Sequence, residues 1–107
     1  LEQALSHSLA IYLALDGDAV VGLIRLVGDG FSSVFVQDLI VLPTYQRQGI
    51  GSALMKQALG DFKGAYQVQL VTEQTEKNVR FYRSIGFETL STYDCIGMIW
   101  VDREKLQ

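Results

Sequence analysis

The sequence predicts an α/β domain with a mixed sheet, or an α+β variant of it, and three observations carry this prediction. β-rich runs fill most of the first forty residues, a helical stripe of apolar residues starts at Gly49, and β-rich and helical segments alternate after it. The chain has 107 residues, of which 49% are hydrophobic, which suffices for one core but not for two. We therefore expect a single domain over residues 1–107.

The first three strands follow from β-rich runs and the turns between them. Ser8–Leu15 and Ala19–Val27 are separated by Asp-Gly-Asp, and Asp-Gly readily adopts the positive φ of a tight hairpin turn. These two runs should pair antiparallel. Ser33–Leu42 is a third run rich in Val, Leu and Ile, and it ends before Pro43, which cannot donate to a strand ladder.

The first helix is predicted from its apolar periodicity. From Gly49 onward, apolar residues recur three and four positions apart, which is typical of an amphipathic helix, and Gly60 is expected to end it. In Tyr66–Val71, apolar and polar residues then alternate as they do in a strand. Because a strand, a helix and a second strand follow one another here, we expect a right-handed crossover and a parallel pairing of Ser33–Leu42 with Tyr66–Val71.

A second helix is expected over Glu76–Ile85, ended by Gly86. Phe87–Leu90 and Cys95–Val101 are then predicted as a last pair of short strands. Cys95 is the only cysteine, so no internal disulfide can form, and we expect it to be buried and inert.

Composition excludes several classes of partner. No apolar run is long enough to cross a bilayer, and the formal net charge of −3 with no Lys and Arg cluster argues against nucleic-acid binding. Leu1–His7 lacks the features of a signal peptide, and His7 should be solvated. We therefore expect a soluble, cytoplasmic protein with no membrane, nucleic-acid or metal partner.

The most informative segment is the polar loop that precedes the first helix. Helix N-termini expose backbone amides that bind anions, and glycines let a phosphate approach the backbone closely. Arginine adds a full charge, and glutamine amides can donate hydrogen bonds. This chemistry predicts a phosphorylated cofactor held by Gln46, Arg47, Gln48, Gly49, Ile50, Gly51 and Ser52.

Other phosphate loops fit this segment less well. A Walker A motif needs Gly-Lys-Ser or Gly-Lys-Thr, and the dinucleotide fingerprint needs a third glycine where Leu54 stands. A helix start that uses its glycines only for packing is the remaining alternative. The β-rich run and Pro43 that precede the loop favour the phosphate-binding interpretation.

Gln46, Gly49 and Gly51 resemble the hallmark of the Gcn5-related N-acetyltransferase (GNAT) family, which is Gln or Arg, two variable residues, Gly, one variable residue, then Gly or Ala. The preceding segment Asp38–Pro43 is similar to that family's fourth strand. This resemblance implies the GNAT fold and acetyl-coenzyme A (acetyl-CoA) as cofactor. It also implies that the backbone of Leu39, Ile40 and Val41 binds the pantetheine arm.

Asn78–Phe87 resembles a second GNAT signature, Asn-x-x-x-Phe-Tyr-x-x-x-Gly-Phe, with two residues in place of three between Asn78 and Phe81. Asn78 and Tyr82 are four residues apart and share a helix face. The resemblance implies that Asn78 binds the pantetheine region and that the Tyr82 hydroxyl is the general acid for the thiolate. The alternative is that Tyr82 only packs the helix on the sheet. Phe81 and Phe87 are expected in the core.

The reaction that the resemblance implies is direct attack of a primary amine on the acetyl thioester, without a covalent enzyme intermediate. A backbone N–H near Val41 would stabilise the oxyanion. Asp38 and Glu73 are candidate bases, and a water chain could replace either. Several family members carry a carboxylate in the strand where this chain has Gln67 and Gln69.

GNAT proteins usually have a strand and two helices ahead of the first hairpin, where this chain has only Leu1–His7. We expect either that this wall of the acceptor site is missing from the sequence, or that a partner subunit supplies it, for which a homodimer is one arrangement. The acceptor would be a small-molecule or peptide amine. Two alternatives remain, a non-catalytic acyl-CoA-binding regulatory module and a protein-interaction domain that uses an exposed sheet edge.

Overall fold

The computed structural model describes residues 2–106, which form two compact units, one up to Glu73 and one from Gln74 on. The prediction of a single domain stays a prediction. The first unit contains α1 (Glu2–Ser6), β1 (Ala10–Asp16), β2 (Ala19–Gly28), β3 (Val34–Val41), the 3-10 helix η1 (Pro43–Tyr45), α2 (Ile50–Asp61) and β4 (Val68–Leu70). The second unit contains α3 (Glu76–Ile85) and the 3-10 helices η2 (Leu90–Tyr93) and η3 (Arg103–Leu106).

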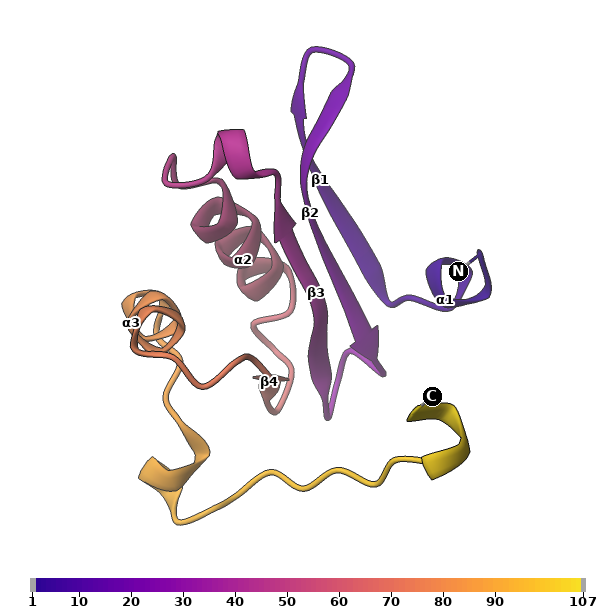
Figure 1. Cartoon of the computed structure of the whole chain (residues 1–107), viewed down its shortest axis with the longest axis vertical. Coiled ribbons are helices and arrows are strands. Elements are labelled where there is room, and N and C mark those ends of the chain that lie inside the picture. Colours follow the sequence, from indigo (N-terminus) through magenta and orange to yellow (C-terminus); the bar gives the residue numbers. More distant parts are fainter. Residues whose placement is uncertain (1, 107) are drawn as a thin grey trace. The chain divides into compact units, whose positions relative to one another are not determined.

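The sheet of the first unit has the strand order β1-β2-β3-β4 (Figure 1). β1 pairs antiparallel with β2, β2 pairs antiparallel with β3, and β3 pairs parallel with β4. The predicted mixed α/β fold, the hairpin and the parallel pairing are therefore confirmed. Gly17 in the hairpin turn has a φ of 61°, as the Asp-Gly pair predicts.

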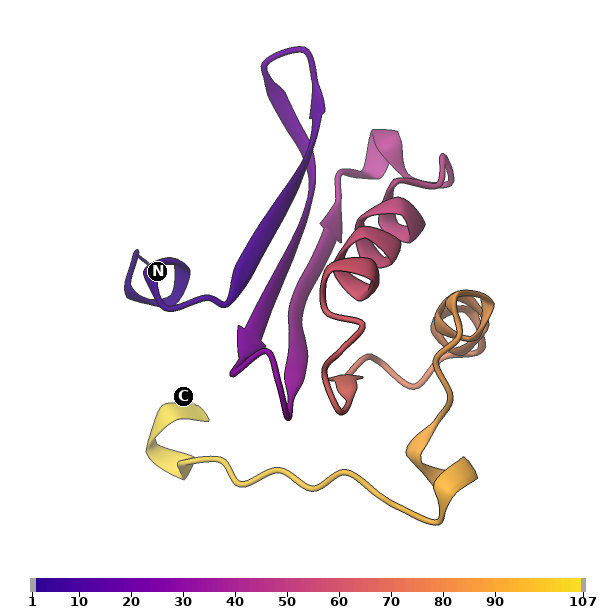
Figure 2. The ribbon, with the colours of Figure 1, turned by 180° about the vertical axis from the view of Figure 1, so that it is seen from behind.

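The core lies between one face of this sheet and α2. Figure 2 shows the sheet and α2 from behind. Ile24 of β2 and Met55 of α2 are both 0% exposed. Each such side chain contributes about 1.5–3 kcal/mol by its removal from water. Among the residues that the structure describes, the buried apolar ones come from β2, β3 and α2: Val21, Ile24, Leu26, Val34, Val36, Leu54, Met55 and Ala58.

Gly22 of β2 lets the first turn of α2 approach the sheet closely. A Cβ at this position would lie 3.0 Å from Ile50 Cγ2 and 3.3 Å from Leu54 Cδ1. Any larger residue would push the start of α2 away from the strand. Gly22 therefore sets the position of the helix N-terminus.

The predicted end of the first helix is wrong, whereas that of the second is confirmed. α2 continues through Gly60 to Asp61, and the N–H of Phe62 donates to the Ala58 carbonyl. A glycine in an exposed helix interior costs only about 1 kcal/mol, which the packing of α2 exceeds. Gly86 ends α3 with a φ of 119°.

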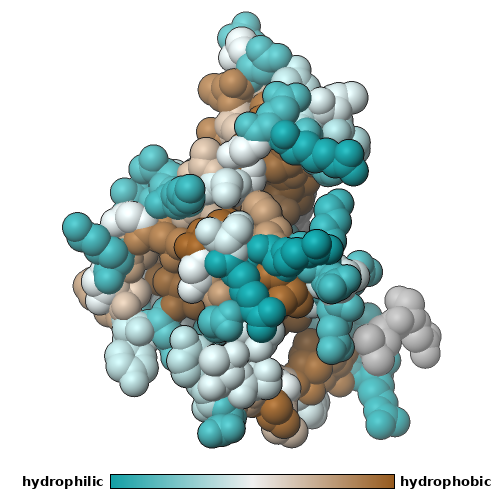
Figure 3. Space-filling model, turned by 90° about the vertical axis from the view of Figure 1, so that its left-hand side faces the viewer, coloured by the Kyte–Doolittle hydropathy of each residue, from teal (hydrophilic) through white to brown (hydrophobic). Residues whose placement is uncertain are grey.

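The predicted last pair of strands is also wrong. Phe87–Leu90 and Cys95–Val101 form no strand among residues 2–106. An apolar run becomes a strand only where a partner supplies ladder bonds and packing. Cys95 is exposed, which contradicts the prediction of a buried thiol. On the face shown in Figure 3, apolar side chains reach the surface in patches bordered by hydrophilic ones.

The N-terminal segment contains the short helix α1, which the sequence pattern did not predict. His7 is exposed as expected, and its Nδ1 lies 2.8 Å from the Gln3 carbonyl oxygen. Within residues 2–106, every helix is too short or too polar to cross a membrane.

Candidate functional site

β3 carries a bulge where its pairing with β4 ends. Leu26 and Arg25 are consecutive in β2 but pair with Val36 and Asp38, so Gln37 is an extra residue in β3. The ladder between β3 and β4 stops at Val36 and Leu70. Beyond the bulge, β3 therefore runs to Val41 without a strand on its β4 side among the described residues.

The backbone of this last part of β3 offers hydrogen-bond donors on the open side. The Leu42 N–H donates to the Val21 carbonyl of β2 at 2.9 Å. Because successive N–H groups point to opposite sides of a strand, those of Val41 and Leu39 face away from β2, and that of Ile40 faces it. Of the three predicted pantetheine contacts, Leu39 and Val41 thus present donors on the open side, and Ile40 does not.

The loop after β3 is held by its own side chains. Gln46 Nε2 donates to the Val41 carbonyl at 3.0 Å, and Gln48 Nε2 donates to the Thr44 carbonyl at 3.4 Å. The Tyr45 hydroxyl donates to Asp16 at the end of β1, and this hydrogen bond raises the pKa of Tyr45, with a further contribution from the Asp16 charge. Both glutamine amides, predicted as phosphate donors, shape the loop in this structure.

α2 begins without a side-chain cap. Gly49 is the N-cap residue with a φ of 82°, and no side chain accepts a hydrogen bond from the first amides. The first helical bond runs from the Ala53 N–H to the Gly49 carbonyl, so the amides of Ile50, Gly51 and Ser52 precede the helical bonding pattern. A Cβ at Gly49 would meet no atom within 4 Å, so the space beside it is open.

Arg47 adds a second left-handed residue to this loop, with a φ of 64°. Non-glycine residues adopt this conformation at a cost, and such strain clusters at ligand-binding loops. Left-handed residues that alternate with other conformations turn neighbouring N–H groups toward one concave surface. The free amides at the N-terminus of α2 and the positive charge of Arg47 two residues before Gly49 are the chemical groups that anions bind.

The N-terminus of α3 differs, because Thr75 caps it. The Thr75 hydroxyl accepts from the Asn78 N–H at 3.1 Å. Asn78 and Tyr82 are half-buried and lie on one face of α3. The Tyr82 ring meets those of Phe81 and Phe87 edge-on, with centroids 4.9 Å and 5.9 Å apart. Phe81 and Phe87 are half-buried, so the prediction of core positions holds only in part.

The two candidate bases occupy different settings in the first unit. Asp38 Oδ2 lies 2.7 Å from Arg25 Nε, and Arg25 Nη1 also reaches the Ser8 hydroxyl at 3.3 Å. This ion pair lies on the sheet face away from α2, because the neighbouring Ile24 faces the helix. Glu73 is exposed, three residues past β4. Their roles as bases stay predictions.

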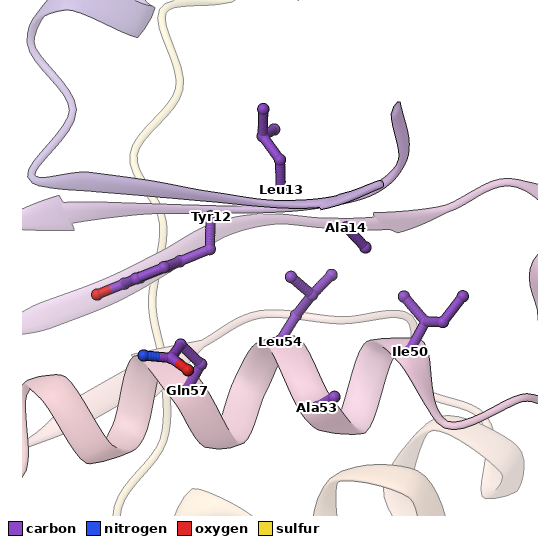
Figure 4. A pocket seen from close by; sticks show the side chains of 7 residues that line it. All are labelled: Tyr12, Leu13, Ala14, Ile50, Ala53, Leu54 and Gln57. Carbon is purple, nitrogen blue, oxygen red and sulfur yellow. The ribbon is translucent and has the colours of Figure 1, made fainter. Parts of the chain in front are cut away.

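A pocket of about 380 Å³ between β1 and α2 was missed by sequence reasoning. Figure 4 shows Tyr12 and Ala14 pointing toward α2, whereas Leu13 points away from it. The Tyr12 hydroxyl donates to Asp61 Oδ2 at 2.6 Å. Burial, then this hydrogen bond and the Asp61 charge, raise the pKa of Tyr12 to about 12. The pocket is lined by Tyr12, Leu13, Ala14, Ile50, Ala53, Leu54 and Gln57.

Comparison with known proteins now decides the family. The acetyltransferase (GNAT) domain family matches residues 7–89, which is most of the chain. The chain belongs to the GNAT acetyltransferase family. The predicted resemblance is therefore confirmed.

Similar proteins are named as acetyltransferases. The chain is 31% identical over 91 residues to serotonin N-acetyltransferase 2 (chloroplastic) of Oryza sativa, a match that covers 81% of this chain and 46% of that protein. A solved GNAT family acetyltransferase from Streptococcus pneumoniae matches with 86% identity and a TM-score of 0.91, over 95% of this chain and 77% of that one. A GNAT family acetyltransferase from Elizabethkingia anophelis, solved with acetyl-CoA bound, shares the fold at 22% identity with a TM-score of 0.70, over 82% of this chain and 59% of that one. The chain thus spans less than half of the rice relative.

Proposed function

We propose that this chain is an N-acetyltransferase domain that transfers the acetyl group of acetyl-CoA to a primary amine. The observation that carries the proposal is the uncapped start of α2 behind Gly49, which follows directly on the open end of β3. Family membership and the acetyl-CoA bound to the Elizabethkingia relative support it.

The residues of the first unit fit coenzyme A in two respects. The amides of Gly51 and Ser52, with the Arg47 guanidinium, supply positive potential for a diphosphate. The Leu39 N–H supplies a donor for the amide-containing pantetheine arm, which leaves the Val41 N–H on the same open side for the acetyl group of the cofactor. A glycine at position 49 keeps the approach to these amides clear, because any side chain there would occupy the open space.

Acetyl-CoA supplies the activated thioester when it is bound. The Val41 N–H is our candidate donor for the negative charge that develops on the carbonyl oxygen. The Tyr82 hydroxyl would return a proton to the departing thiolate. No covalent intermediate on the protein is needed, since the amine attacks directly. Asn78 would hold the pantetheine region, as the family resemblance implies.

The amine must lose a proton, and we retain Asp38 and Glu73 as the candidate bases. Asp38 is held by Arg25, so its carboxylate has a fixed position in β3. Asp38→Asn and Glu73→Gln each replace one carboxylate by an amide, so the two variants together show which residue is the base. The base variant should lower turnover with an unchanged affinity for CoA.

Isothermal titration calorimetry with coenzyme A tests the cofactor site. Gly49→Ala should weaken binding at least about tenfold, because the new methyl group both strains the left-handed backbone and enters the open space. Gly60→Ala is the matched control in the same helix, because its Cβ would also meet no atom within 4 Å but its φ is not positive. Absence of binding heat from the folded wild type would contradict the proposal.

Release of free thiol from acetyl-CoA with a panel of primary amines tests the transfer itself. The panel should include serotonin, for which the rice relative is named. Tyr82→Phe should slow turnover by about 10²-fold or more if the hydroxyl donates the proton. An unchanged rate in Tyr82→Phe would show that the Tyr82 hydroxyl is not the general acid. Binding heat without turnover on any amine would identify a non-catalytic CoA-binding module instead.

A further inference from the structure

Residues 95–101, which we call the apolar segment, expose large side chains in succession. Met98, Ile99 and Trp100 are 91%, 87% and 86% exposed, and Ile96 is 79% exposed. Successive residues of an extended chain point to opposite sides, so this segment is apolar on both faces. That pattern is typical of a strand buried between two layers.

The apolar segment nevertheless pairs with no strand in the described part of the chain. It is drawn without an arrow in Figure 1, between η2 and η3. Within residues 2–106, the N–H of Cys95 bonds to Leu90, and no backbone hydrogen bond involves residues 96–101. Its backbone donors and acceptors are therefore as available as its side chains.

β4 supplies a matching acceptor in the first unit. It is an edge strand of the sheet and pairs only over Val68–Leu70. The apolar residues that flank it, Tyr66 and Val71, are 85% and 83% exposed. Natural edge strands are usually protected by charged residues, and residues 66–72 contain none. The apolar segment is also seven residues long and uncharged.

We propose that the apolar segment of one chain adds as a strand to the β4 edge of a second copy of this chain. Each chain carries one donor segment and one acceptor edge, so two copies can each donate and accept, which closes a two-fold dimer. A large aromatic side chain buries about 150–250 Å², so two segments that each insert Trp100 and four aliphatic residues bury on the order of 1,000 Å², the size at which an interface becomes specific. Neither the apolar segment nor residues 66–72 include a residue that we assign to the cofactor site.

Light scattering of the full-length wild type tests the association, and proline substitutions test its strand character. Adjacent N–H groups of a strand point to opposite sides, so either Gly97→Pro or Met98→Pro must remove a ladder bond. We expect at least one of them to raise the dimer dissociation constant about tenfold or more, with Gly97→Ala and Met98→Leu close to wild type. Far-UV circular dichroism checks that all variants fold.

Cross-linking tests which edge accepts the segment. Wild-type chains, with Cys95 as their only thiol, are mixed with chains that carry Cys95→Ser and Gln69→Cys in β4. A short bifunctional thiol reagent should join the two kinds of chain. Chains with Cys95→Ser and Leu13→Cys, on the opposite sheet edge β1, are the matched control and should not be joined.

A monomeric mass at every soluble concentration would overturn the proposal and favour a different protein, or the chain's own sheet, as the partner of the segment. Cross-links to β1 in place of β4, or dimers that tolerate both proline variants, would also overturn it.

Discussion

The two units of this chain are built on different sources of order. Up to Glu73, a sheet and α2 enclose a core whose largest members are fully buried. From Gln74 to Lys105, no described side chain is buried, yet α3 is a regular helix of 10 residues. Its ends carry local signals, a Thr75 cap and a left-handed Gly86. Burial in a closed core orders the first unit, whereas the helix of the second is half-buried on one face and carries a capping signal at each end.

This difference bears on where ligands and partners bind. α2 is fixed by packing and can leave its first amides without a side-chain cap. α3 uses its own threonine for the equivalent amide. The second unit exposes the apolar segment, which would be stabilised by another chain. Four predictions test the contrast, in order of expected effect.

The largest effect is expected from two methionines with opposite exposure. Met55→Ala should lower the free energy of unfolding by about 3 kcal/mol, because Met55 is 0% exposed and its removal leaves a cavity. Met98→Ala should change it by no more than about 0.5 kcal/mol, because Met98 is 91% exposed. Urea denaturation at a concentration that keeps the protein monomeric measures both. Equal losses would break the comparison between the units.

Two left-handed glycines give the next effect. A Cβ at Gly28 would lie 2.3 Å from the Ser33 carbonyl oxygen, so Gly28→Ala should cost about 2 kcal/mol or more. Gly86→Ala should cost about 1 kcal/mol, because its Cβ would meet no atom within 4 Å and only the backbone is strained. Thermal unfolding of both variants compares them. A smaller loss at Gly28 than at Gly86 would indicate that the β2–β3 turn relaxes.

The cap of α3 should contribute less than Gly28 and about as much as Gly86. Thr75→Ala should cost about 1 kcal/mol, because the Asn78 N–H loses its acceptor. Thr75→Ser keeps the hydroxyl and serves as the control. Circular dichroism at the helix band follows the loss. If Thr75→Ala leaves the helix signal and the melting curve unchanged, local capping does not order this unit.

The smallest effect is expected at Tyr12 in the first unit. Tyr12→Phe should cost about 1 kcal/mol or less, because the bond to Asp61 is close to solvent. The pKa of Tyr12 is raised from 10.0 to about 12, so the bond contributes fully below pH 10 and its contribution is lost as pH rises through about 12. The stability difference between wild type and Tyr12→Phe should therefore shrink over that range.

Tyr93→Phe is the matched control for this titration, because Tyr93 is 67% exposed in the second unit. Its stability should follow the wild type across the same pH range. A difference between wild type and Tyr12→Phe that is constant from pH 10 to pH 12 would show that the Asp61 bond does not control the titration of Tyr12.

The sequence alone determined the elements whose signals are local. The Asp-Gly turn at Gly17, the apolar periodicity of α2 and the stop at Gly86 are read from a few neighbouring residues, and each predicted its element. The family motifs around Gln46 and Asn78 likewise predicted the GNAT fold, because residue types in a motif are read directly from the sequence.

Only the tertiary structure decided the features that depend on residues distant in sequence. The bulge at Gln37 exists because of its pairing with β2. The close approach at Gly22 depends on Ile50 of α2. The ion pair of Asp38 depends on Arg25 in the adjacent strand. The apolar segment has strong β-propensity, and yet it forms no strand, because propensity yields a ladder only where a second strand supplies its hydrogen bonds.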